Sequence, residues 1–254
     1  MKVTMTASKF AIITGSGTGI GKAAALALLQ DGWHVALAGR REEPLRKLSF
    51  ESGYSQNCLV IPTDVSDPHA VKELFGQVLN TWGRIDLLFN NAGLSAPPVP
   101  LEELSVEQWR QVVDVNLNGM FYCIQQAFIA MKTQSPKGGR IINNGSISAY
   151  APRPDSIAYT STKHAVSGLT KTAALDGRQY QIAVGQIDIG NAATEMATPM
   201  AKGVKQANGE IKPEPLMDVA EVGRSIVYMA NLPLTANVLF HTLMATNMPF
   251  VGRG

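Results

Sequence analysis

The chain has 254 residues, of which 45% are hydrophobic and 17% are charged, and its formal net charge is +2. This composition is ordinary for a globular protein and excludes a disordered or disulfide-rich chain. The small net charge gives no electrostatic footprint for nucleic acid, and no run reaches the roughly 18 apolar residues of a membrane span. We therefore expect neither nucleic acid nor a membrane as a partner.

The start of the chain and its cysteines favour a cytoplasmic location. Residues 1–10 contain no apolar segment of the kind that a secretory signal needs. Cys58 and Cys123 lie in apolar surroundings, so we expect reduced core residues rather than a disulfide or a metal site. The four histidines are scattered without ligand spacing, and no metal is expected.

Strand-like and helix-like segments alternate along the chain. The apolar runs predict strands over residues 10–15, 34–39, 58–64, 85–93, 139–146 and 181–190, and a last strand could form within 237–245. The helical periods predict helices over residues 21–32, 42–53, 67–83, 105–132, 156–175 and 218–232. Gly32 closes the first helix, and Asp67 followed by Pro68 opens the third.

This order of elements predicts the fold class. Regular alternation implies a parallel sheet covered by helices on both faces, and near-continuous apolar strands fit a sheet that is buried on both sides. No linker interrupts residues 10–232. We predict one α/β domain over residues 1–254, a three-layer doubly wound and mostly parallel sheet of about seven strands. Ligands bind such sheets at the carboxyl ends of the strands.

The loop after the first strand, "TGSGTGIG", has the spacing Gly15-x-x-x-Gly19-x-Gly21. The commoner G-x-G-x-x-G pattern fails, because it would need glycine at Ile20. Glycines allow a tight turn and a close approach of a pyrophosphate, and the next helix offers free N–H groups and a positive dipole end. A flexible surface turn is the alternative, but a position between a strand and a helix favours binding.

Further motifs follow the later strands. They are "NNAG" at 90–93, "VNLNG" at 115–119, Ser146, and Tyr159-x-x-x-Lys163. Each is modest alone, but with the glycine loop they form an ordered set that resembles the short-chain dehydrogenase/reductase family over almost the whole chain. The resemblance implies a Rossmann fold, a nicotinamide cofactor and a catalytic tetrad of Asn116, Ser146, Tyr159 and Lys163.

The residue types in this tetrad suit the reduction of a carbonyl. A ketone that accepts hydride needs a proton on its oxygen. A phenol, whose ordinary pKa is ~10, can supply that proton. Lys163 lies one helical turn from Tyr159, and an ammonium stabilises phenolate. Ser146 can donate a hydrogen bond to the same oxygen, with Ser148 as a nearby rival. By resemblance, Asn116 marks a bend that holds a water and a proton relay to Lys163.

The resemblance also implies the cofactor contacts. Lys163 would hold the nicotinamide ribose, and Asp64 would hold the adenine, although Asp64 could instead cap the turn that follows it. The full set of expected cofactor-binding residues is Gly15, Ser16, Thr18, Gly19, Ile20, Gly21, Arg40, Arg41, Asp64, Val65, Asn91, Ala92, Gly93, Tyr159, Lys163, Gly190, Ala192 and Thr194.

The segment after the sixth strand departs from the family. Where the family has Pro-Gly, this chain has Ile189-Gly190, and Thr194 fits the family's phosphate or carboxamide contact. Residues 191–215 are rich in Ala, Gly and Pro and could form a substrate lid. Residues 232–254, the C-terminal tail, also lack the family's aspartate-glycine ending.

The end of the second strand predicts the choice of cofactor. A protein that selects NAD(H) usually places an acid there, to bind the ribose and repel a 2′-phosphate. Here the position is Gly39, and Arg40 and Arg41 follow it. Arginine is suited to phosphate. A solvated pair neutralised by Glu42 and Glu43 is the alternative, yet two cations before a helix oppose its dipole. We predict a preference for NADP(H).

Several functions remain open at this point. The leading interpretation is an NADP(H)-dependent carbonyl reductase or alcohol dehydrogenase, acting on a small-molecule carbonyl or alcohol. A 3-oxoacyl thioester reductase of the same family and a non-catalytic NADP(H)-binding regulatory protein are the alternatives. Apolar residues on several faces of the helices at 105–131 and 156–178 predict contacts between subunits. The family suggests a homotetramer, with a homodimer as the smaller assembly.

Overall fold

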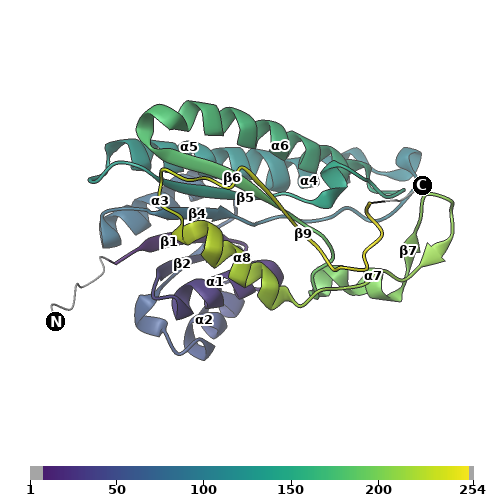
Figure 1. Ribbon diagram of the computed structural model, residues 1–254, viewed down its shortest axis with the longest axis horizontal. Helices are drawn as coiled ribbons and strands as arrows, with labels where there is room; N and C mark the ends of the chain where they lie inside the picture. The colour runs from purple at the N-terminus through teal and green to yellow at the C-terminus, as the bar shows by residue number, and fades with distance from the viewer. Residues whose placement is uncertain (1–7, 252–254) are drawn as a thin grey trace.

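A seven-stranded sheet runs through the computed structural model, which describes residues 8–251 (Figure 1). The strand order is β3-β2-β1-β4-β5-β6-β9, and every neighbouring pair is parallel. The predicted doubly wound sheet is thus confirmed. What the sequence predicts for residues 1–7 and 252–254 lies outside the described residues.

All seven predicted strands form. Their bounds are β1 Phe10–Thr14, β2 His34–Gly39, β3 Cys58–Pro62, β4 Leu87–Asn90, β5 Gly139–Asn144, β6 Ile182–Ile189 and β9 Phe240–Leu243. β4 and β5 end earlier than predicted, at Asn90 and Asn144, because the motif residues that follow leave the sheet for the loops at its carboxyl edge. A separate two-stranded antiparallel hairpin, β7 Val204–Lys205 and β8 Ile211–Lys212, lies within the segment predicted as a lid.

Helices cover both faces of the sheet (Figure 1). Their bounds are α1 Gly19–Gln30, α2 Glu42–Glu51, α3 Pro68–Trp82, α4 Val106–Val113, α5 Gly119–Thr133, α6 Ile157–Gly177, α7 Thr198–Lys202 and α8 Val219–Asn231. Short helical turns are η1 Ser55–Asn57, η2 Leu101–Glu103, η3 Asp114–Asn118, η4 Ile147–Ala149, η5 Arg178–Tyr180 and η6 Glu195–Ala197. Within the described residues, no helix combines the length and apolar character needed to cross a membrane.

Side chains next to the helix ends explain several of these bounds. Asp67 accepts a hydrogen bond from the backbone N–H of His69 at 2.8 Å, and Pro68 occupies the first position of α3, as predicted. Gly83 ends α3 in the left-handed conformation, with φ of 77°. Ser105 and Gln108 form a reciprocal capping box at the start of α4.

Two apolar cores hold the layers together, one on each face of the sheet. Helices α3, α5 and α6 contribute to the first core, and α1, α2 and α8 contribute to the second. Cys123 lies in the first core, where burial raises the pKa of its thiol to about 12. Cys58 was predicted to be a core residue, but it is only half-buried, because β3 is the edge strand of the sheet. Both cysteines are free thiols.

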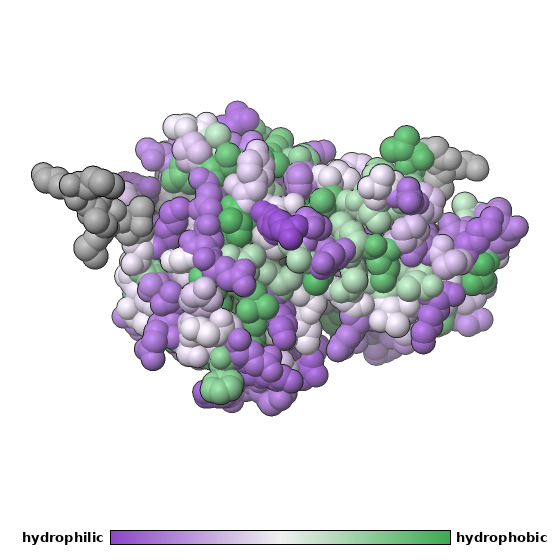
Figure 2. Space-filling model, turned by 60° about the horizontal axis from the view of Figure 1, so that its bottom comes forward, coloured by the Kyte–Doolittle hydropathy of each residue, from purple (hydrophilic) through white to green (hydrophobic). Residues whose placement is uncertain are grey.

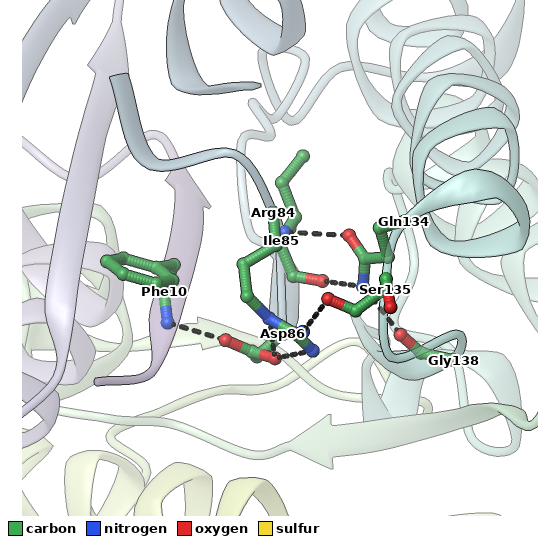
Figure 3. A network of polar contacts seen from close by, with 7 residues as sticks. All are labelled: Phe10, Arg84, Ile85, Asp86, Gln134, Ser135 and Gly138. Atoms are coloured by element: carbon green, nitrogen blue, oxygen red, sulfur yellow. Dashed lines mark hydrogen bonds and ion pairs between the residues drawn. The ribbon is translucent and has the colours of Figure 1, made fainter. Parts of the chain in front are cut away.

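A polar network closes the amino end of the sheet, away from the strand ends that carry the motifs (Figure 3). The side chain of Gln134 accepts a hydrogen bond from the N–H of Ile85 at 2.9 Å. It also donates to the carbonyl oxygens of Ile85, at 2.9 Å, and of Gly138, at 2.7 Å. Arg84 pairs with Asp86 at 2.6 Å, and Asp86 accepts from the N–H of Phe10 at 3.0 Å. The network ties β1 and β4 to the loop that enters β5.

We expect Gln134→Ala to destabilise the fold. The change leaves three buried backbone groups without a partner, and the free energy of unfolding should fall by about 2 kcal/mol. Urea denaturation measures this effect. Gln125→Ala, at an exposed position of α5, the helix that Gln134 follows, is the matched control and should change stability by less than about 0.5 kcal/mol. Equal stability of the two variants would contradict the role assigned to Gln134.

Candidate active site

The loop between β1 and α1 is closely packed against the loop that follows β4. Gly15 has a φ of 64°, and a Cβ atom there would lie 2.9 Å from the Cα of Ala92. A Cβ on Gly21 would lie 2.2 Å from the carbonyl oxygen of Gly15. Glycine at position 15 therefore allows the positive φ of the turn and the close approach of Ala92. Glycine at position 21 allows α1 to pack closely on its own loop.

The start of α1 has no capping hydrogen bond from the side chain that precedes the helix. Thr18 is the residue that precedes the helix, and its side chain forms no capping hydrogen bond. Ser16 is buried, and its hydroxyl donates to the carbonyl oxygen of Ala38 at 3.2 Å, so its side chain faces inward. A Cβ on Gly19 would lie 3.2 Å from the Cγ2 of Thr194, which brings the segment after β6 next to the glycine loop. Ile20 packs against the second core.

The "NNAG" motif locks the end of β4 to the end of β1. Asn91 donates from its side chain to the carbonyl oxygens of Thr14, at 3.0 Å, and of Gly15, at 3.1 Å. The Thr14 hydroxyl accepts from the backbone N–H groups of Asn91 and Ala92, both at 3.0 Å. Asn144, at the end of β5, donates to the Asn91 side chain at 3.0 Å. Three strand ends are thereby fixed around one point.

Tyr159 and Lys163 lie together in the first turns of α6. The Lys163 side chain is buried, with only 4% of the residue exposed, and its Nζ lies 5.4 Å from the ring centroid of Tyr159. The same Nζ donates to the carbonyl oxygen of Asn144 at 2.7 Å. Within residues 8–251, the Tyr159 hydroxyl has no hydrogen-bond partner and so stays available to a ligand. The structure therefore brings together the phenol and the ammonium that the sequence pairs.

Ser146 follows β5 and precedes the short turn η4. Its Oγ accepts a hydrogen bond from the backbone N–H of Ser148 at 3.1 Å. This bond uses an oxygen lone pair and leaves the hydroxyl proton free to donate elsewhere. Ser148, considered above as a rival, is buried too, and it supports Ser146 through its backbone.

Asn116 lies in a π-helical turn, η3, that separates α4 from α5. The helix predicted over 105–132 forms without a break in helical backbone from Val106 to Thr133, and the irregularity expected at Asn116 is this π-helical turn. The Asn116 side chain accepts from the N–H of Leu94 at 2.8 Å, donates to the carbonyl oxygen of Leu94 at 2.9 Å, and donates to the Thr162 hydroxyl at 3.3 Å. A Cβ on Gly93 would lie 3.3 Å from Asn116 Oδ1. The irregular turn thus joins the loop after β4 to the residue that precedes Lys163.

Two arginines without a carboxylate partner follow β2. Arg40 and Arg41 are exposed, and within residues 8–251 neither forms an ion pair. Glu42 pairs instead with Arg46, one turn along α2, at 2.5 Å. Within the described residues, neither Glu42 nor Glu43 forms an ion pair with Arg40 or Arg41, as the alternative would require. A pair of cations next to the glycine loop can bind an anion.

Asp64 and Val65 follow β3. The Asp64 carboxylate accepts from the backbone N–H of Ser66 at 3.0 Å and from its hydroxyl at 2.7 Å. The capping role considered for Asp64 is therefore present. Val65 is buried, and a Cβ on Gly119 would lie 2.8 Å from its carbonyl oxygen. This contact holds the β3 loop against the start of α5.

A buried ion pair, missed in the sequence, holds the segment after β6. Arg153 pairs with Glu214, and its Nη2 donates to the Asn191 side chain at 3.1 Å. Asn191 donates to Glu214 at 2.8 Å, and Gln206 donates to the same carboxylate at 3.1 Å. Burial alone would raise the pKa of Glu214, but these hydrogen bonds and the charge of Arg153 outweigh it and lower the pKa.

Of the other predicted residues of this segment, Gly190 lies beside the C-terminal tail, and Ala192 lies beside the segment that leads into α8. A Cβ on Gly190 would lie 2.6 Å from the Cβ of Met244. Ala192 is buried and forms an isolated parallel bridge with Met217. Asn191, between them, is held by hydrogen bonds to both Arg153 and Glu214.

We expect Glu214→Gln to destabilise the protein by about 2 kcal/mol at neutral pH, because Arg153 loses its counter-charge. A carboxyl with a lowered pKa contributes stability above its ordinary value of 4.5 and loses it as the pH falls through the lowered pKa. The stability difference between wild type and variant should therefore shrink in acid. Urea midpoints at neutral and acid pH measure it. A difference that does not change with pH would contradict this assignment.

The assembled site fits a dinucleotide. It joins a sterically required glycine loop, an open helix start, two free arginines and a buried ammonium beside a phenol. Within residues 8–251, no three His, Cys, Asp or Glu side chains are grouped so that they could hold a metal ion. The arrangement can bind phosphates at one end and transfer a proton at the other.

Comparisons with known proteins agree with this geometry. The family model described as short chain dehydrogenase matches residues 9–205. The chain is 33% identical over 232 residues to a short chain dehydrogenase/reductase, astE, of Aspergillus oryzae, covering 88% of each chain. The structure of ElxO with NADP bound is similar at a TM-score of 0.82 and 30% identity, over 93% of this chain and 96% of that one. A 3-ketoacyl-(acyl-carrier-protein) reductase from Brucella melitensis, complexed with NADH, shares the fold at a TM-score of 0.83 and 22% identity, over 94% and 98%.

Proposed function

Because the chain belongs to the short-chain dehydrogenase family and is an oxidoreductase that acts on hydroxyl or carbonyl groups, we propose that it moves a hydride between NADP(H) and a carbonyl or secondary alcohol. Tyr159 serves as the acid and base. The observation that carries the proposal is the buried Lys163 ammonium, 5.4 Å from the Tyr159 ring and bound to the carbonyl oxygen of Asn144.

Each residue of the tetrad has a chemical task in this proposal. When bound, the nicotinamide supplies or accepts the hydride. Tyr159 donates its phenolic proton to the carbonyl oxygen, and Lys163 stabilises the phenolate that remains. Ser146 donates its hydroxyl proton in a hydrogen bond to the same oxygen. Asn116, in the π-helical turn, holds a water through which protons are relayed to Lys163. In the oxidation of an alcohol, the same groups act in reverse.

The free arginines support NADP(H) over NAD(H). In the proposal, Arg40 binds the 2′-phosphate with its planar guanidinium, and Arg41 makes a second contact. The glycine loop and the open start of α1 bind the pyrophosphate. Asp64, Val65, Asn91, Ala92, Gly93, Gly190, Ala192 and Thr194 complete the cofactor contacts. Residues 191–215 act as a lid over the substrate.

We also propose a cytoplasmic location, because both cysteines are free thiols.

A panel of ketones, aldehydes and secondary alcohols tests the reaction class. Carbonyl-dependent loss of NADPH absorbance, or alcohol-dependent gain from NADP⁺, is the expected result. A neutral and mostly apolar carbonyl should perform best. The segments that we expect to line the substrate site, residues 93–100, 148–159 and 195–204, are mostly apolar and contain Met196, Met200 and several prolines. Tight binding of NADPH without turnover of any compound in either direction would favour the non-catalytic alternative.

We expect the protein to assemble, most simply as a homotetramer. Large apolar side chains are exposed on α4 and α5, including Trp109, Phe121 and Ile129, and others on and after α8, including Tyr228 and Leu239. Figure 2 shows hydrophobic patches among polar side chains on one face of the molecule. Light scattering measures the mass in solution. The mass of a single 27.2 kDa chain at micromolar concentration would contradict this prediction.

A further inference from the structure

A buried carboxylate lies directly behind Ser146. Asp188, near the end of β6, is fully buried. Its Oδ1 accepts a hydrogen bond from the backbone N–H of Ser146 at 2.9 Å, and its Oδ2 accepts from the Tyr150 hydroxyl at 2.9 Å. Neither Asp188 nor Tyr150 belongs to the tetrad or to the cofactor contacts.

A row of buried polar side chains crosses the sheet to this carboxylate. Asn90 on β4 donates to Asn143 on β5 at 3.0 Å, and Asn143 donates to the Thr170 hydroxyl on α6 at 2.9 Å. That hydroxyl lies 2.9 Å from Gln186 Oε1, and Gln186 Nε2 donates to Asp188 at 2.7 Å. Each amide donor in this row faces toward Asp188. The Thr170 hydroxyl links the two halves of the row and also lies 2.9 Å from the carbonyl oxygen of Val166.

The local sequence makes room for this contact. A Cβ on Gly145 would lie 2.1 Å from Asp188 Oδ1, so glycine is required for the carboxylate to reach the backbone of Ser146. Burying a carboxylate is costly unless donors surround it, and an apolar residue would suit a central strand better. Of the proposed catalytic groups, Ser146 is the one that Asp188 contacts. The other two donors to Asp188, the Tyr150 hydroxyl and the Gln186 side chain, lie outside the tetrad.

Two contacts together define the direction of the Ser146 hydroxyl. Asp188 holds the backbone N–H, and the N–H of Ser148 holds one lone pair of Oγ. The hydroxyl proton is then left to point toward a ligand. Tyr150 remains a hydrogen-bond donor to Asp188, because its partial burial and the carboxylate itself raise the pKa of Tyr150 to about 12.

We propose that Asp188 is a positioning residue, which fixes the backbone of Ser146 so that the serine hydroxyl faces the substrate oxygen. The inference rests on the proposed function for the task of Ser146, but the hydrogen bond between Asp188 and Ser146 exists independently of it. Tyr150 and Gln186 hold the carboxylate in turn. Asp188 itself touches neither substrate nor cofactor.

A double-mutant cycle with Ser146→Ala tests this role. With NADPH and a ketone found active in the carbonyl panel, Asp188→Ala should lower kcat by about 10- to 100-fold, as misplaced catalytic groups do. The Kd of NADPH should stay within about twofold. In the Ser146→Ala background, the same change should cost less than about twofold, because the hydroxyl to be positioned is gone. Equal losses in both backgrounds would overturn the proposal.

Two further variants distinguish the positioning role from a folding defect. Asp188→Asn keeps an acceptor for the Ser146 N–H, and it should restore kcat to within about fivefold of wild type. Tyr150→Phe removes one donor to the carboxylate at a half-exposed position. It should lower kcat by about two- to fivefold, and this loss too should vanish without the Ser146 hydroxyl. Losses that persist in the Ser146→Ala background would count against the proposal.

Amide hydrogen exchange tests the contact without any turnover. The Ser146 N–H should be protected in the wild type and should exchange at least about tenfold faster in Asp188→Ala. If the wild type turns over no carbonyl, the proposed function fails, while faster exchange still supports the contact to Ser146. Unchanged exchange would overturn the positioning role, even in an active enzyme.

Discussion

Replacing Tyr159 with phenylalanine should lower turnover by at least ~10² to 10⁴, the range typical of a general acid. The phenol supplies the proton that the carbonyl oxygen requires, and its hydroxyl has no other partner within residues 8–251. Phenylalanine keeps the ring beside which Lys163 lies, so the local packing is preserved. The Kd of NADPH should therefore change little, and steady-state kinetics with fluorescence titration separates the two effects.

Tyr54→Phe is the matched control. Tyr54 is exposed and precedes β3, outside the site, and its loss of a hydroxyl should leave turnover unchanged. Near-normal turnover in the Tyr159 variant would remove the basis of the tetrad assignment. A parallel loss of turnover and of NADPH binding would point to a damaged cofactor site instead.

Arg40→Ala should weaken NADPH binding by about 10- to 150-fold and leave NADH binding nearly unchanged. The estimate follows from the roughly 1.5–3 kcal/mol that a hydrogen bond to a charged group contributes. The discrimination arises because NADH lacks the 2′-phosphate that the guanidinium would bind. Arg41→Ala should have the same direction with a smaller effect. Titration of both cofactors against each variant measures the difference.

Arg46→Ala is the control for the loss of one positive charge near the site. Arg46 lies on α2 near the two arginines, but it is paired with Glu42 at 2.5 Å. Its removal should leave the affinity for both cofactors within about twofold, since exposed ion pairs contribute little. Equal wild-type affinity for NADH and NADPH, or equal losses of both in Arg40→Ala, would contradict the NADP(H) assignment.

The sheet and its helices could be predicted because their signals are local. Strands such as β1 and β5 are short apolar runs, and a regular strand–helix alternation permits few topologies. The motif residues fall at strand ends, and parallel strands bring those ends to one edge. That geometry is why Asn91, Asn144 and Lys163, far apart in sequence, form one hydrogen-bonded group.

Two features depend on the three-dimensional structure and not on the local sequence pattern. The helical period of residues 105–132 predicts the helix and Asn116 predicts a bend in it, but the period does not reveal that the bend is a π-helical turn. It forms because the Asn116 side chain is held by the Leu94 backbone. Cys58 has apolar neighbours in sequence, but its position on an edge strand is a property of strand order.

The ion pair of Arg153 and Glu214 could not be read from the sequence, because 61 residues separate its partners. The sequence does carry a signal for Asp188. Gln186 and Asp188 are polar residues within the run of a fully buried strand. Buried polar groups are hydrogen-bonded, so their presence in β6 already required partners on the covered face of the sheet.

Transfer of deuterium from the nicotinamide to the product tests the central claim most directly. NADPH in which deuterium replaces both hydrogens at the carbon that transfers the hydride is mixed with the enzyme and a reducible ketone, and the alcohol is analysed by mass spectrometry. The proposed reaction predicts deuterium on the carbinol carbon of the product, formed by the wild type and nearly absent with Tyr159→Phe. An alcohol product without the label, or no labelled alcohol from any ketone by an enzyme that binds NADPH, would contradict hydride transfer as the function of this protein.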